Sequence, residues 1–143
     1  MDKKRQIKVT VITLVSWLLF CSLIVVVSLS PLSELGEGAN HFNSVGMWTS
    51  FGISTLGYLI PLAFFLLGVK YFKTIMTIFC SMGLLSGLTM IGTIIVLCSF
   101  VSNISYDSTI IGSLISSGLL CVVNLVWFIV VFFPGSKNAI KGS

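Results

Sequence analysis

Carboxylate and imidazole side chains, the groups best suited to bind a metal ion, fall in two polar stretches between apolar runs. Glu34, Glu37 and His41 share the first stretch, and Asp107 lies in the second. Hard oxygen donors with an imidazole can bind a divalent cation. Two glycines between Glu34 and His41 argue against a regular helix presenting these groups, and polar residues in a water-exposed loop are usually only solvated. We therefore expect no metal site.

The cysteines are the residues that would carry thiol–disulfide chemistry. Such chemistry needs accessible, activated thiols, typically in a C-x-x-C pair, and a thiol in apolar surroundings is inert. The chain has four cysteines, none in such a pair and each within an apolar run: Cys21, Cys80, Cys98 and Cys121. We expect them to be apolar packing residues. A membrane thiol oxidoreductase is the least favoured interpretation, and no catalytic residue or cofactor is expected.

A third set of polar side chains, Tyr58, Ser86, Thr89 and Asn124, falls near the middle of long apolar runs. It could line a small pore or a ligand cavity. No charge converges with it, so hydrogen bonds between helices, each worth about 0.6 kcal/mol, are the favoured interpretation. The residues expected to control helix packing, and hence any functional surface, are Gly57, Tyr58, Pro61, Gly83, Ser86, Gly87, Ser116, Ser117 and Asn124.

The composition indicates an integral membrane protein. Of the 143 residues, 56% are hydrophobic and only 8% are charged, and the mean hydropathy is +1.11. The net charge of +4 could suggest a nucleic-acid binder. However, the basic residues form small groups beside apolar runs, as topology signals do. We expect no nucleic-acid partner.

Four apolar runs, each long enough to cross a bilayer as a helix, must position these side chains. We place them at residues 9–29, 47–69, 74–100 and 109–133, with outer loops at 30–46 and 101–108 and a basic inner turn at 70–73. The first run is too long for the apolar region of a signal peptide. The prediction is one all-α domain over residues 1–143, a bundle of four transmembrane helices.

Local signals refine these spans. Pro31 disfavours helix just before it and ends the first span, and Ser44 is a suitable N-cap for the second. Pro61 predicts a kink within the second span. Gly83 and Gly87 have the G-x-x-x-G spacing that lets helix backbones approach closely.

Small and polar residues at helical spacing predict which helix faces meet, because lipid tails are as apolar as leucine. We expect three such faces, from spans 2, 3 and 4, to point at one another: Ser50, Ser54, Gly57 and Pro61; Gly83, Ser86, Gly87 and Met90; Ser113, Ser116, Ser117 and Asn124. Asn124 should lie inside the bundle and hydrogen-bond to a neighbouring helix, because an unpaired carboxamide in hydrocarbon is costly.

The distribution of charge predicts orientation. All eight Lys and Arg residues lie in the N-terminal flank, in the 70–73 turn or in the C-terminal tail, and the outer loops have none. The positive-inside bias therefore places both termini in the cytoplasm. No span contains Asp, Glu, Lys, Arg or His, which argues against proton-driven transport by this chain alone.

The layout combines a basic start, an outer loop with Glu, Gly and Asn, a short basic turn and a Pro-Gly exit. It resembles the small uncharacterised four-span membrane proteins of Gram-positive bacteria, a resemblance that implies no activity. We expect a non-enzymatic accessory, immunity or stress-related component of the cell membrane, in contact with lipid and with other membrane proteins or copies of itself. The alternative is an oligomeric channel, a holin-like protein or a transporter subunit.

Overall fold

The computed structural model describes residues 3–34, 41–100 and 107–133, and within these ranges the chain forms helices and no strand. The four long helices are α1 (Lys3–Leu29), α2 (Val45–Leu66), α3 (Phe72–Phe100) and α4 (Ser108–Phe132), and a short 3-10 helix, η1 (Pro31–Glu34), follows α1. Each long helix has the length and apolarity needed to cross a membrane. The all-α prediction is confirmed.

Local side chains and backbone conformations explain where the helices begin and end. Ser44 caps α2 by accepting a hydrogen bond from the Met47 N–H at 3.2 Å, and Asp107 caps α4 through the Ser108 N–H at 2.8 Å. The helix α1 ends two residues before Pro31, as expected. After α2, Gly68 has a positive φ of 86°, a conformation that glycine adopts without strain and that turns the chain toward α3.

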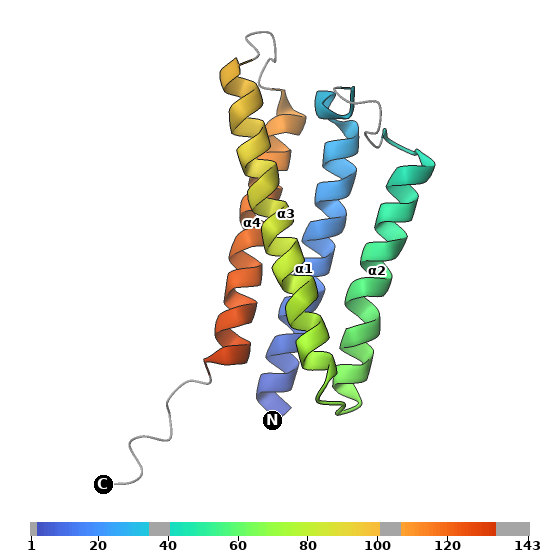
Figure 1. The fold of residues 1–143 in the computed structure, drawn as a ribbon, viewed down its shortest axis with the longest axis vertical. Coiled ribbons are helices and arrows are strands. Elements are labelled where there is room, and N and C mark those ends of the chain that lie inside the picture. The colour runs from blue at the N-terminus through green and yellow to red at the C-terminus, as the bar shows by residue number, and fades with distance from the viewer. Residues whose placement is uncertain (1–2, 35–40, 101–106, 134–143) are drawn as a thin grey trace, which may run out of the picture.

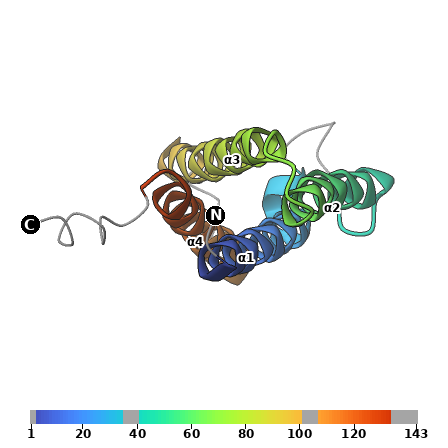
Figure 2. The ribbon, with the colours of Figure 1, turned by 90° about the horizontal axis from the view of Figure 1, so that it is seen from below.

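The four helices form a ring in chain order. Seen along the bundle, α1 lies between α4 and α2, and α3 closes the ring between α2 and α4 (Figure 2). The helices α2 and α4 therefore lie diagonally across the bundle. The most extensive interface joins α1, the first helix, to α4, the last.

The helix α3 crosses the bundle obliquely. It begins beside the end of α2, at the end of the bundle where the N-terminus lies, and finishes beside the start of α4 at the opposite end (Figure 1). As a result, α2 and α3 diverge toward the end of the bundle where α2 begins. The space between them is the setting of the candidate site.

The α1–α4 interface combines apolar packing with polar contacts. The indole N–H of Trp127 donates a hydrogen bond to the Thr13 hydroxyl at 3.0 Å, and both residues are buried. Near the N-terminus, Arg5 donates to the carbonyls of Val130 and Val131, which lie in the last turn of α4. These carbonyls have no partner within their own helix, so the guanidinium acts as a cap from another helix. The main apolar cluster comprises Val9, Tyr58, Leu62, Met76, Cys80, Trp127 and Val131.

Candidate functional site

Three polar side chains from three helices meet in the interior of the bundle. The Ser16 hydroxyl, on α1, donates a hydrogen bond to Oδ1 of Asn124, on α4, at 2.8 Å. The Tyr58 hydroxyl, on α2, lies 3.5 Å from Oγ of Ser16. Ser16 and Asn124 are 0% exposed and Tyr58 is 5% exposed. We call these three residues the polar centre.

Glycines on α3 leave room for the polar centre. A Cβ atom added at Gly83 would lie 2.7 Å from the Tyr58 hydroxyl and 3.0 Å from Nδ2 of Asn124. One turn further along, a Cβ at Gly87 would lie 2.8 Å from Sγ of Cys121 and 3.2 Å from the Ser117 carbonyl oxygen. The G-x-x-x-G spacing thus serves contacts within one chain, where α3 approaches α2 and α4.

The amide nitrogen of Asn124 is the one buried side-chain nitrogen or oxygen atom without a hydrogen-bond partner in the described part of the chain. An unsatisfied buried donor costs roughly 1–3 kcal/mol. Nδ2 and the Tyr58 hydroxyl both lie close to the position that a Cβ at Gly83 would occupy, so two polar groups approach the same point. The Asn124 amide is therefore an unused hydrogen-bond donor next to the phenol of Tyr58.

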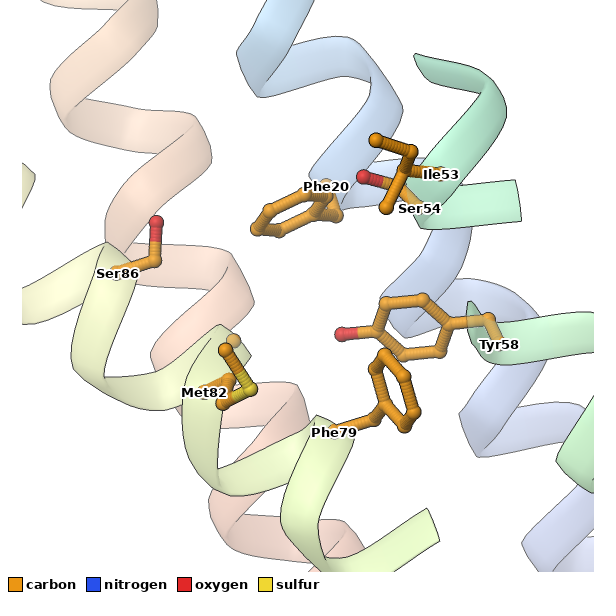
Figure 3. Close-up of a pocket in the computed structure, with 8 residues that line it drawn as sticks. Phe20, Ile53, Ser54, Tyr58, Phe79, Met82 and Ser86 are labelled. Carbon is orange, nitrogen blue, oxygen red and sulfur yellow. The ribbon is translucent and has the colours of Figure 1, made fainter. Parts of the chain in front are cut away.

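A cavity of about 280 Å³ opens next to the polar centre, between α2 and α3. Its lining residues are Phe20, Ile53, Ser54, Tyr58, Phe79, Met82, Gly83 and Ser86. The Tyr58 hydroxyl points into the space between Phe20, Phe79 and Met82, with Ser86 across the cavity (Figure 3). The Tyr58 ring lies 6.2 Å from the Phe20 ring and 6.4 Å from the Phe79 ring, measured between centroids. The walls are therefore aromatic and apolar, with a polar corner.

The chemistry available in this cavity is binding through neutral groups. Every side chain that lines it is uncharged, and its polar groups are hydroxyls. The Asn124 amide lies beside Gly83, one of the lining residues, but it is buried and does not itself line the cavity. Such a site can hold a small apolar molecule and accept one hydrogen-bonding oxygen at its corner.

The structure gathers some of the predicted packing residues and separates others. Tyr58, Pro61, Gly83, Gly87, Ser117 and Asn124 are buried, and a Cβ at Gly57 would meet the Phe79 ring. Ser116 is half-buried, whereas Ser86 is exposed at the cavity. Thr89 is also exposed and returns its hydroxyl to the Leu85 carbonyl of its own helix.

The expectation that three faces, from spans 2, 3 and 4, point at one another is confirmed where α3 meets α2 and α4, but it is incomplete. The helices α2 and α4 are not direct neighbours, because α1 and α3 separate them around the ring. The missing face belongs to α1, where Thr13 and Ser16 are buried and bond to Trp127 and Asn124. Both lie at helical spacing from Val9, which is also buried, so the three residues share one inner face of α1.

The other residues considered for chemistry lie apart from this site. Cys21, Cys80 and Cys121 are buried and Cys98 is half-buried, and all four thiols are free. Glu34 and His41 are exposed, whereas Glu37 lies outside the described residues. Among the residues that the structure describes, no three His, Cys, Asp or Glu side chains are placed to hold a metal ion.

Comparison with known proteins gives a family and a relative. The model of a family of unknown function, DUF5391, matches residues 1–136. The uncharacterized protein YxaJ of Bacillus subtilis (strain 168) is 44% identical over 85 residues, which are 59% of this chain. The chain spans about three fifths (59%) of the length of that relative. No solved structure matches the chain.

Proposed function

Because the chain belongs to this family of unknown function, DUF5391, we propose its function from its own geometry. We propose that it is a multi-pass protein of the cell membrane, a non-enzymatic accessory, immunity or stress-related component. It acts by holding a neutral, lipid-soluble molecule in the cavity between α2 and α3. The observation that carries this proposal is an aromatic cavity with the Tyr58 hydroxyl at its corner, next to Gly83, behind which the Asn124 amide lies without a partner among the described residues.

Membrane placement is supported by an inverted distribution of polarity. Large apolar side chains are exposed along all four long helices, for example Ile7, Ile53, Ile95 and Ile129. The buried interior contains hydroxyl and amide groups instead, namely Thr13, Ser16, Ser113, Ser117 and Asn124. In water this arrangement would leave extensive apolar surface unburied. In a bilayer the exposed apolar side chains face lipid, and the polar groups lie inside the bundle, where they find hydrogen-bond partners or are shielded from the lipid.

The proposed orientation has both termini in the cytoplasm. The described basic residues lie at one end of the bundle, in the first turns of α1 and around the α2–α3 turn: Lys3, Lys4, Arg5, Lys8, Lys70 and Lys73. Glu34 and Asp107 lie at the other end. The positive-inside bias then favours the basic end as cytoplasmic. Lys137 and Lys141, part of the same expectation, lie outside the described residues.

Binding without catalysis is supported by the groups available in the cavity. Acid–base chemistry near neutral pH needs a side chain that titrates there, and the lining offers hydroxyls only. The occupant is inferred to be neutral because a charged group would have no counter-charge in the lining. A carbonyl oxygen fits the polar corner, since the Tyr58 hydroxyl lines the cavity and can donate to it, and the proposal adds the nearby Asn124 amide as a second donor that the ligand reaches past Gly83.

Photolabelling with benzophenone tests the proposal, because this neutral aromatic ketone has one carbonyl and inserts into nearby C–H bonds when irradiated. In mild detergent, labelling should concentrate on Met82 and Phe79. Met82→Trp, which fills the cavity, should abolish that labelling, whereas Leu88→Trp, at a similarly exposed position on the same helix that does not line the cavity, should not. Tyr58→Phe should weaken the labelling by about tenfold, the effect of losing a hydrogen bond of roughly 1.4 kcal/mol.

Two matched competitors test the role of the carbonyl. Fluorenone and fluorene have nearly the same shape, but only fluorenone has a carbonyl oxygen. Fluorenone should displace benzophenone more strongly, and the difference should disappear in the Tyr58→Phe, Asn124→Leu double variant. Labelling spread evenly over exposed positions would contradict the proposal. A ring of copies in mild detergent would favour the oligomeric channel, holin-like or transporter-subunit interpretation.

A further inference from the structure

A second cavity, separate from the first, lies at the basic end of the bundle. Its volume is about 560 Å³, and its lining includes Arg5, Gln6, Phe65, Val69, Lys70 and Lys73. We call it the basic pocket. Two segments distant in the sequence form it, the start of α1 and the α2–α3 turn, and Gln6 joins them by donating to the Leu66 carbonyl at 3.5 Å.

The three cations of the basic pocket have no carboxylate near them in the described part of the chain. Arg5 donates to backbone carbonyls of α4, and Lys73 places Nζ 5.3 Å from the centroid of the Phe132 ring. These neutral partners orient the cations without cancelling their charge. The described carboxylates, Glu34 and Asp107, lie at the far end of the bundle. Three like charges around one cavity repel one another and attract an anion.

The walls of the basic pocket indicate what kind of anion fits. Phe65 and Val69 line it together with the cations, and Leu66 and Leu67 beside them are exposed. The ligand therefore meets positive charge and apolar surface at the same site. An anionic phospholipid has both matching parts, a phosphate and acyl chains, whereas free phosphate has only the first.

We propose that the basic pocket binds the phosphate of an anionic phospholipid, with the acyl chains lying along the apolar end of α2. This inference rests on the membrane placement proposed above, and it does not depend on the cavity between α2 and α3. In that placement the pocket lies at the cytoplasmic interface, the level of the lipid headgroups. Basic pockets between helices on that side are suited to anionic headgroups.

Native mass spectrometry of the full chain in mild detergent tests the proposal, with phosphatidylglycerol and phosphatidylcholine as probes. The protein should retain phosphatidylglycerol preferentially. Lys70→Gln and Lys73→Gln should each weaken its binding about fivefold, the effect of one basic charge near an anionic surface. Lys8→Gln is the matched control, because Lys8 is exposed on α1 at the same end and does not line the pocket. It should leave the affinity unchanged.

Three outcomes would overturn the basic-pocket proposal. The first is equal retention of the two lipids, and the second is an equal loss of affinity in the Lys8→Gln control. The third is displacement of phosphatidylglycerol by inorganic phosphate at the same concentration, which would indicate a simple anion site. Resistance of the protein to alkaline extraction from liposomes tests the membrane placement separately. Circular dichroism and thermal unfolding of each variant in detergent check that the fold is intact.

Discussion

Asn124 shows at the scale of a single residue how one side chain can contribute to both stability and binding. Its carbonyl oxygen accepts from Ser16 and joins α1 to α4, whereas its amide nitrogen has no protein partner. A leucine would fill similar space but would leave the buried Ser16 hydroxyl without its acceptor, so the carbonyl oxygen contributes to stability, whereas the amide nitrogen makes no such contribution. Under the proposed function, the free N–H is the second donor to the ligand, beside the Tyr58 hydroxyl.

The glycines of α3 give the first prediction. Gly87→Ala should destabilise the protein by about 1–3 kcal/mol, because the new Cβ meets the Ser117 backbone, which cannot move aside as a side chain can. Gly92→Ala is the control: no atom lies within 4 Å of its added Cβ, and alanine favours helix by up to about 1 kcal/mol. Thermal unfolding in detergent measures both. Equal loss of stability in the two variants would contradict the close approach of α3 to α4.

Larger substitutions in α3 extend this comparison as a second prediction. Gly83→Leu and Gly87→Leu should destabilise more than Leu84→Ala, because a side chain at Gly83 would displace the Tyr58 hydroxyl and the Asn124 amide together. Leu84 is only half-buried, so its truncation removes less packing. The same unfolding measurement decides the order. If the glycine and leucine variants are equally stable, the assigned inner face of α3 is wrong.

The cysteines give a third prediction at the residue scale. Replacing all four with alanine should leave the phenotype of the gene and the benzophenone labelling unchanged, because no thiol lines the cavity between α2 and α3. A small loss of stability is expected from Cys80, which lies in the main apolar cluster. Loss of the phenotype, with the protein still folded, would revive the thiol oxidoreductase interpretation.

At the scale of helices, the α1–α4 contact gives a fourth prediction. Thr13→Val should destabilise the protein by roughly 1–3 kcal/mol, because the buried Trp127 N–H would lose its acceptor. Thr10→Val is the matched control, since Thr10 returns its hydroxyl to the Gln6 carbonyl of its own helix and accepts nothing from α4. The Thr10→Val substitution should change the free energy of unfolding by no more than about 0.5 kcal/mol. Unfolding in detergent, followed by tryptophan fluorescence, compares the two.

The elements were more predictable than their arrangement. Length and apolarity were enough to find four helices, and Ser44 was predicted as a cap from its type and position. The ring order was not predictable, because apolar periodicity distinguishes inside from outside only when the outside is water. For the same reason the polar inner face of α1, with Thr13 and Ser16, was missed. A serine or threonine in an apolar helix usually bonds to its own backbone, so it does not indicate a partner helix.

At the scale of the whole molecule, the separation of charge gives a fifth prediction. Reporters fused after Lys141 and inserted at Lys73 should report cytoplasm, and one inserted at Gly38 should report the outside. The physical reason is that the described cations gather at one end of the bundle and Glu34 and Asp107 lie at the other. Enzymatic reporters active on only one side of a membrane make this measurement. An outside signal from the C-terminal fusion would contradict the orientation.

The pairing of the first helix with the last has a consequence for biosynthesis. A ribosome completes α1 early, yet two of its buried hydroxyls, on Thr13 and Ser16, have their partners on α4, at Trp127 and Asn124. A nascent chain that ends before Ser108 therefore cannot close the ring, and Trp127 and Asn124 are not yet available to it. Assembly must wait until α4 has been translated. In the proposed membrane placement, chains that end before α4 would present an open polar face, a feature by which quality-control proteases can distinguish them from chains that contain α4.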